Sequence, residues 1–211
     1  MKRKIKNGKE KTRKKLILYS ADGFTERKLF KALNNKLKNY LLINARDLNA
    51  GGGPIDIMKK LIKLSSAERK LYHKIFAIFD LDSKTNIEEV KKYIKICQER
   101  GFYIIFTNLC IENWFFLFHN KGLGRYDTGK KVKENLKKIS DGNYCGENDY
   151  NVEFYLEKEN IEKAKKRIKK EMENDNYTQD NILEYFKQSI IPVPATNFYE
   201  IFDFFEEEGE W

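Results

Sequence analysis

The chain has 211 residues, of which 41% are apolar and 14% aromatic, so it can bury a core and is not disordered from end to end. Its net charge is +9, and residues 2–15 hold nine Lys or Arg against one acid. This balance favours a polyanionic partner such as nucleic acid, although Lys-rich proteins are also basic merely for solubility. No apolar run approaches the ~20 residues of a membrane span, and three widely spaced cysteines indicate neither disulfides nor zinc. We therefore expect a soluble, cytoplasmic protein that does not bind membranes.

Four short apolar segments have the composition of buried strands. They are residues 16–19, 40–43, 74–79 and 102–106. The segments between these strands have apolar residues at helical spacing. Thr25 is the expected N-cap of the first helix, and Pro54 is at the start of the second. The third helix runs from Asn86 to Arg100 and is closed by Gly101. The alternation predicts an α/β fold in which a four-stranded parallel sheet is flanked by helices on both faces.

After about residue 120 the alternation of apolar strands and amphipathic helices ends, and the chain becomes rich in Lys and Glu. Ile161, Ala164, Ile168 and Met172 share one helical face. A final docking helix is predicted from the spacing of its apolar residues, Phe198, Ile201, Phe202 and Phe205. The expected organisation is a basic flexible arm (1–14), an α/β domain (15–120) and a mainly helical C-terminal region packed on it (121–211).

Acidic residues follow three of the four predicted strands. Asp22 and Glu26 follow the first, Asp80 and Asp82 the third, and Glu112 lies just beyond the fourth. The carboxyl ends of parallel strands meet at one edge, where carboxylates repel one another unless a cation neutralises them. Oxygen ligands without a His or Cys cluster point to Mg²⁺ or Mn²⁺. The alternative for Asp80 and Asp82 is a turn followed by a helix cap.

The same motifs, taken together, resemble a known family. They are Thr25-Glu26, Gly-Gly-Pro at 52–54, Ile-Phe-Asp-Leu-Asp at 78–82, Thr-Asn-Leu-Cys-Ile-Glu-Asn-Trp at 107–114 and Pro194-Ala195-Thr196. This series is similar to the RloB-like branch of the Toprim superfamily and covers nearly the whole chain after the basic arm. The Asp-x-Asp pair and the segment 110–114 are its most specific parts.

The resemblance implies a Toprim-like fold and a Mg²⁺-dependent endonuclease that cleaves RNA, with tRNA among the candidates, or DNA. It further implies that Asp80 and Asp82 hold the metal, while Asp22 and Glu26 complete the metal site or act as general base. Glu112 would be a further ligand or would orient one. Similar proteins, including the Toprim effectors of PARIS and abortive-infection systems, serve anti-phage defence beside an ABC-type or AAA-type ATPase, so such a partner is expected.

The first acidic motif allows two alignments. The Toprim pattern has Glu-Gly directly after the first strand. If this sequence is shifted by one residue against that pattern, Asp22-Gly23 corresponds to the Glu-Gly and Glu26 keeps its spacing. A match without a gap instead places Ala21 at the position of that Glu. The first alignment retains the acid and the glycine, and we prefer it. The second removes a central acid and supports a different function, a catalytically degenerate module that binds the ATPase or a phage protein.

Several basic residues are candidates for contacts with backbone phosphates. These are Lys2, Arg3, Lys4, Lys14, Lys130 and Lys131. The run Lys165-Lys166-Arg167 either grips phosphates or forms a solvated helix face. The aromatic residues 114–116 favour core packing over base stacking.

Overall fold

A computed structural model describes residues 14–20, 23–44, 53–81, 85–119, 121, 126–171 and 196–210, with only the backbone described at 14–20, 43 and 44. The elements, in chain order, are β1 (Lys14–Ser20), α1 (Phe24–Lys36), β2 (Tyr40–Asn44), α2 (Pro54–Lys63), α3 (Ser66–Arg69), β3 (Lys74–Leu81), α4 (Ile87–Glu99), β4 (Tyr103–Asn108), α5 (Glu112–Phe116), the 3-10 turn η2 (Leu117–His119), α6 (Gly129–Ile139), β5 (Tyr144–Gly146), β6 (Asp149–Tyr150), α7 (Val152–Tyr155), α8 (Lys158–Glu171) and α10 (Glu200–Glu207).

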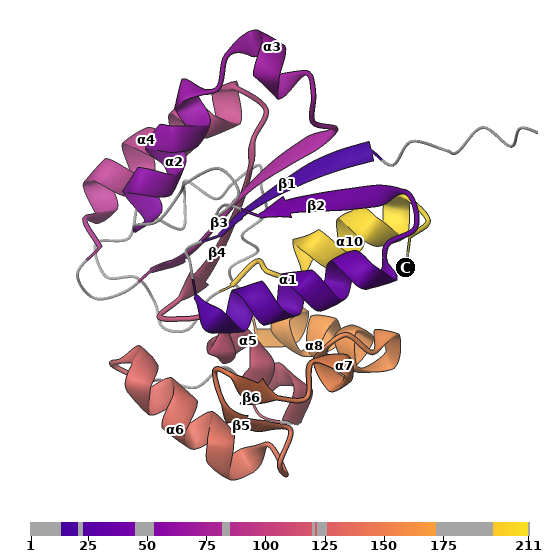
Figure 1. Cartoon of the computed structure of the whole chain (residues 1–211). Helices are drawn as coiled ribbons and strands as arrows, with labels where there is room; N and C mark the ends of the chain where they lie inside the picture. The colour runs from indigo at the N-terminus through magenta and orange to yellow at the C-terminus, as the bar shows by residue number, and fades with distance from the viewer. Residues whose placement is uncertain are drawn as a thin grey trace, which may run out of the picture.

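The larger sheet has the strand order β2-β1-β3-β4, and its three strand pairs are parallel. Helices α2 and α4 cover one face, and α1 and α10 cover the other (Figure 1). The middle of the sheet is buried because β3 contributes five consecutive buried residues, Ile75 to Phe79, which pack against helices on both faces. The carboxyl ends of β1, β3 and β4 therefore meet at one edge.

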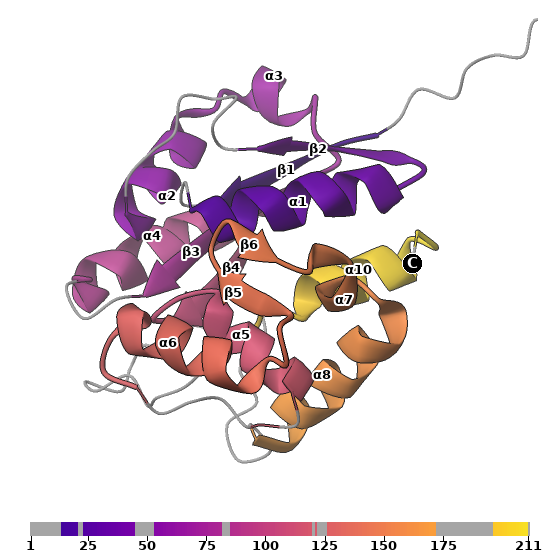
Figure 2. The ribbon, with the colours of Figure 1, turned by 60° about the horizontal axis from the view of Figure 1, so that its bottom comes forward.

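The predicted fold class is wrong in expecting a single sheet; the described part of the chain after residue 120 is mainly helical, as predicted, but it also contains two strands. The strands form two sheets, since β5 and β6 pair antiparallel within the region expected to be helical. Figure 2 shows this second sheet beside α1, at the end of the molecule that also holds α6 and α8. The reason for the error is length: strands of three and two residues are too short to show an alternating pattern.

Two predicted boundaries also change. The third strand does not stop at Phe79 but continues through Asp80 to Leu81, because Asp80 and Leu81 pair with Thr107 and Asn108 of β4. Asp80 is thus a strand residue and not part of a turn. Helix α4 agrees with its prediction more closely, with Asn86 as N-cap accepting a hydrogen bond from the Glu89 N–H at 3.2 Å, and with Gly101 at φ 76° after its end.

The segment before α10 covers the outer edge of β4. Thr196 and Thr107 form an antiparallel bridge, and the Thr196 hydroxyl donates to the Phe106 carbonyl at 3.0 Å. The Asn197 side chain accepts from the Phe106 N–H and donates to the Ile104 carbonyl, each at 2.8 Å. An open strand edge exposes unpaired backbone groups, and these contacts satisfy several of them. Thr196, from the Pro-Ala-Thr motif, therefore has a structural role here.

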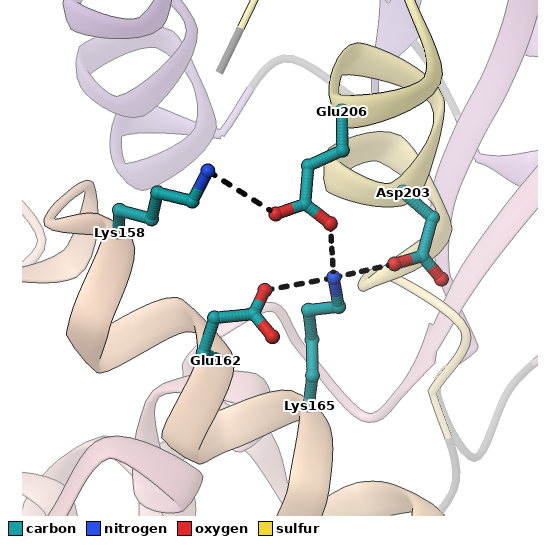
Figure 3. Close-up of polar contacts among 5 residues, drawn as sticks. All are labelled: Lys158, Glu162, Lys165, Asp203 and Glu206. Atoms are coloured by element: carbon teal, nitrogen blue, oxygen red, sulfur yellow. Dashed lines mark hydrogen bonds and ion pairs between the residues drawn. The ribbon is translucent and has the colours of Figure 1, made fainter.

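A buried lysine joins α8 to α10. The Lys165 side chain is 6% exposed, and its Nζ lies 2.8 Å from Glu162, 2.6 Å from Asp203 and 2.7 Å from Glu206 (Figure 3). For Lys165 both predicted alternatives, a phosphate contact and a solvated face, are wrong. The apolar faces themselves agree with the prediction, because Ile161, Ala164 and Ile168 on α8 and the docking residues of α10 are buried. Met172 lies outside the described residues.

Candidate active site

The candidate site lies where β1, β3 and β4 end side by side. Ser20 of β1 pairs with Ile78 of β3, and Asp80 pairs with Thr107. The segments that follow these strands, which carry Glu26 and Glu112, thus start from neighbouring positions. In the sequence Asp22 follows β1 and Asp82 follows β3, and both lie outside the described residues.

Glu26 folds back over the start of α1. The N-cap of this helix is Gly23, and a Cβ placed on Gly23 would lie only 1.9 Å from Glu26 Oε2, so a glycine is required for the carboxylate to occupy this position. The prediction that Thr25 is the N-cap is wrong, because Thr25 lies inside the first turn and its hydroxyl is used elsewhere. This close approach of Glu26 to Gly23 gives the Asp22-Gly23 alignment a physical basis: the glycine is the residue that admits the acid.

The protonation of Glu26 is shifted towards neutrality. The pKa of Glu26 is raised from 4.5 to about 7, mainly by burial and also by the neighbouring carboxylates of Glu112 and Glu147. A hydrogen bond to its own backbone N–H and the charge of Lys133 oppose this rise. A carboxyl group with a pKa near 7 can gain or lose a proton at physiological pH, which is the property required of a general acid or base.

Glu112 is held inside the protein by two hydroxyl groups. The Thr25 hydroxyl donates to Glu112 Oε1 at 2.6 Å, and the Tyr144 hydroxyl donates to the same oxygen at 3.1 Å. Tyr150 in turn donates to the Thr25 carbonyl at 2.7 Å. Burial, followed by the charge of Glu112, raises the pKa of Tyr144 far above its usual value, so the phenol remains a donor. Because two hydroxyl groups fix its carboxylate, Glu112 is suited to orienting the residues that contact it.

Asp80 is half-buried and close to Cys110. Burial, then the charges of Glu112 and Asp80, raise the pKa of the Cys110 thiol well above its usual value, so this cysteine is not a nucleophile. The backbone between β4 and Cys110 is strained, with Leu109 at φ 71°, a conformation that costs a non-glycine residue about 1–3 kcal/mol. The Leu109 N–H bonds to the Leu81 carbonyl at 2.8 Å, which fixes the ends of β3 and β4 together.

Helix α6 brings a cation to this cluster. Lys133 pairs with Glu147, and although burial acts in the opposite direction, the charges of Glu112 and Glu147 raise the pKa of Lys133 above its usual value. The predicted phosphate contacts on the same helix are exposed ion pairs: Lys131 lies 2.8 Å from Asp127, and Lys130 lies 3.9 Å from Glu134. Lys2, Arg3 and Lys4 lie outside the described residues, and Lys14 begins β1 with its side chain undescribed.

The structure thus brings Glu26, Glu112 and Asp80 to one region, with Glu26 and Glu112 close enough to influence one another. An all-oxygen donor set suits a hard divalent cation such as Mg²⁺. The carboxylates in the described part of the chain do not complete a metal site by themselves, since no group of three His, Cys, Asp or Glu there could hold an ion. The other two predicted ligands, Asp22 and Asp82, lie outside the described residues.

Sequence reasoning missed the residues that support this site. Tyr144, Lys133 and Glu147 come from the region that was expected to be a helical annex, and their contacts with Glu112 and Glu26 span 21 or more positions in the chain. No local pattern marks a tyrosine as the partner of a glutamate 32 residues away. The buried acid in an apolar segment was the available signal, because such an acid needs a partner.

Comparison with known proteins identifies a family. The model of the RloB-like proteins matches residues 17–204. No curated protein and no solved structure matches the chain. In the described part of the chain, no helix combines the length and hydrophobicity needed to cross a membrane. The matched range contains β2, β3, β4, residues 17–20 of β1 and all the acidic residues of the candidate site, and the chain belongs to the RloB-like family.

Proposed function

We propose that this protein is a Toprim-type endonuclease, dependent on Mg²⁺ or Mn²⁺, that cleaves a phosphodiester bond in RNA, with tRNA among the candidates, or in DNA. The observation that supports this most is the buried Glu26 carboxyl, whose pKa is raised to about 7 at the sheet edge that also carries Asp80. General bases are tuned to a pKa in this range, and strongly shifted carboxyl groups cluster at functional sites.

In this proposal Glu26 accepts a proton from a water molecule as that water attacks the phosphorus atom. A new P–O bond forms, the P–O bond to the sugar oxygen of the leaving strand breaks, and that oxygen takes a proton from solvent. Asp80, together with Asp82 and Asp22, would hold the divalent cation, which supplies charge neutralisation and a more acidic water when bound. Glu112, fixed by Thr25 and Tyr144, keeps α5 and the first turn of α1 in register.

The biological setting is proposed from the family resemblance. We propose that the chain acts in anti-phage defence and that an ABC-type or AAA-type ATPase encoded nearby controls its activity. The basic arm and the Lys-rich helices would follow the backbone phosphates of the substrate.

Purified protein with Mg²⁺ or Mn²⁺, incubated with labelled tRNA and with plasmid, tests the activity. The assay is run with and without the triggered ATPase. We expect cleavage that Asp80→Ala and Glu26→Gln each reduce by at least a hundredfold, in line with the contribution of a general base. Asp127→Ala is the matched control, because Asp127 is an exposed acid paired with Lys131 on α6. Cleavage that survives Asp80→Ala unchanged would rule out this site.

A second function is favoured by one observation. The Glu112 carboxylate is already engaged by two hydroxyl groups, as expected for an acid with a structural role. In a catalytically degenerate module the acidic cluster would stabilise a surface that binds the ATPase. Under this alternative no nucleic acid is cut even with the triggered ATPase present, while the two proteins co-elute in size-exclusion chromatography.

A further inference from the structure

A basic pocket lies at the opposite edge of the sheet from the carboxylates. It has a volume of about 370 Å³ and is bounded by the chain from Ser66 to Ile75 and by residues 100–102. These segments lead into the amino ends of β3 and β4, beside α3 in Figure 1. Nothing in the proposed chemistry uses this region.

The lining of the pocket is strongly one-sided in charge. Four permanent cations, Arg69, Lys70, Lys74 and Arg100, line it together with His73, and none of the described lining residues is acidic. Elsewhere on the described surface lysines are commonly paired, as Lys131 is with Asp127 and Lys163 with Glu159. A hollow that collects cations without carboxylates attracts an anion.

Two of the cations, Arg100 and Lys74, make contacts other than ion pairs. The Arg100 guanidinium donates to the Ile62 carbonyl, and Lys74 Nζ lies 3.7 Å from the centre of the Tyr103 ring. In the described part of the chain, Arg69 and Lys70 have no acidic partner within ion-pair distance. Among the described lining residues, His73 is the one with a carboxylate nearby, since its Nε2 lies 3.6 Å from Glu208 Oε1. The positive charge of the pocket therefore remains largely available to a ligand.

The position of the pocket indicates a long polyanion as its ligand. β1 enters the sheet at the same edge, because Leu16 pairs with Lys74, and the sequence before β1 carries seven of the basic residues of the arm. A nucleic-acid strand that occupies the pocket would lie near the point where this basic sequence joins β1, which favours a polyanion over a single small anion.

We propose that this pocket binds a backbone phosphate of the nucleic acid whose cleavage site lies at the carboxylates. The proposal rests on nucleic acid as the substrate class put forward above. Arg69, Lys70 and Arg100 hold the phosphate.

The test measures binding in EDTA, so that no strand is cut. A fluorescein-labelled 20-nucleotide single strand is titrated by anisotropy at several salt concentrations. We expect Arg69→Gln/Lys70→Gln to weaken binding about tenfold and to lower the magnitude of the salt slope by about 1.4, since each phosphate contact on a single strand contributes about 0.7. The matched control is Lys92→Gln/Lys95→Gln, which removes the same charge from exposed positions of α4.

An equal loss with both pairs would show a general charge effect and overturn the proposal, as would failure of the parent protein to bind the oligonucleotide. Pyrophosphate is the second probe: if the pocket pair abolishes its binding but leaves the oligonucleotide affinity unchanged, the ligand is a small anion and the strand proposal is wrong. The nuclease proposal fails separately. In that case no variant and no parent cuts the strand, yet the pocket pair still loses affinity.

Discussion

At the scale of single residues, the Glu26 carboxylate occupies the space that a side chain at position 23 would need. A Cβ at position 23 would lie 1.9 Å from Glu26 Oε2, although the backbone there, at φ −73° and ψ 146°, is open to any residue. We expect Gly23→Ala to lower the free energy of unfolding by about 1 kcal/mol, because the carboxylate must move but is the end of a flexible side chain. In the Glu26→Ala background, where the carboxylate is gone, the same substitution should change stability by less than about 0.5 kcal/mol.

Urea unfolding of the four proteins in this cycle measures the coupling. If Gly23→Ala costs the same with and without the Glu26 side chain, the carboxylate does not lie over the glycine. The assignment of Asp22-Gly23 to the Toprim pattern would then lose its physical basis.

The raised pKa of Glu26 also predicts a pH dependence of stability. Between its ordinary value of 4.5 and about 7 the folded state binds the proton more tightly than the unfolded state, so stability falls as pH rises through this window. The destabilisation is absent below the window and complete above it, and it amounts to on the order of 3 kcal/mol. Glu26→Gln keeps the shape and removes the titration.

Relative to the parent, Glu26→Gln should therefore gain stability by roughly this amount between pH 4.5 and pH 8, measured by urea unfolding. Glu159→Gln is the control, since Glu159 is an exposed partner of Lys163 and its pKa is lowered by that contact. A stability difference between Glu26→Gln and the parent that is constant across this range would contradict a pKa near 7.

At the scale of elements, the sequence was sufficient where a segment is long and strongly patterned. β3 and α4 were located because five consecutive buried residues and a regular apolar face leave little ambiguity. The β5–β6 pair was missed, since two or three residues carry no period. The side of the site built by Tyr144 was missed with it, because its hydrogen bond to Glu112 depends on how this second sheet packs against α5.

The contact between Asn197 and β4 predicts a cost for a change of one atom. Asn197→Asp retains the acceptor for the Phe106 N–H but loses the donor to the Ile104 carbonyl, and it places a carboxylate oxygen against that carbonyl. Because Asn197 is fully buried, we expect a loss of at least about 1–3 kcal/mol in thermal or urea unfolding. Asn135→Asp is the same chemical change on the solvent side of α6, where Asn135 bonds to the Lys131 carbonyl, and it should cost little. Similar losses at both positions would show that the edge contact contributes nothing specific.

The Lys165 cluster predicts how firmly α10 is attached. Lys165→Met leaves three carboxylates facing one another across α8 and α10, and we expect it to cost about 3 kcal/mol, as when one partner of a buried ion pair is removed. Lys163→Met on the same helix breaks an exposed pair with Glu159 and should cost at most about 0.5 kcal/mol. Limited proteolysis with mass spectrometry should show cleavage near α10 in the first variant and not in the second. Equal protection of α10 in both variants would contradict a role for Lys165 in its attachment.

At the scale of the whole molecule, charge is divided between the two ends of the chain. Residues 2–13 contain seven Lys or Arg and one acid, whereas residues 200–211 contain six acids and no base. The acids of α10 are partly neutralised by Lys165 and Lys158, as Figure 3 shows. Acidic residues of α10 thus form ion pairs within the folded protein. The surplus positive charge is concentrated in the N-terminal sequence and around the edge of the sheet where β3 and β4 begin.

This distribution predicts that the arm contributes affinity for nucleic acid and little stability. Replacing the seven Lys and Arg of residues 2–13 with Ser changes the net charge from +9 to +2 and should weaken binding of a single-stranded oligonucleotide at low salt by at least tenfold, with a shallower salt slope. The midpoint of urea unfolding should stay within experimental error, since these residues precede the range that matches the family, 17–204. A control in which the five lysines of residues 2–13 become Arg keeps every charge and should retain the affinity. Loss of binding in that control as well would mean that the affinity depends on the lysine side chains themselves and not on their charge. The electrostatic account of the arm would then be wrong.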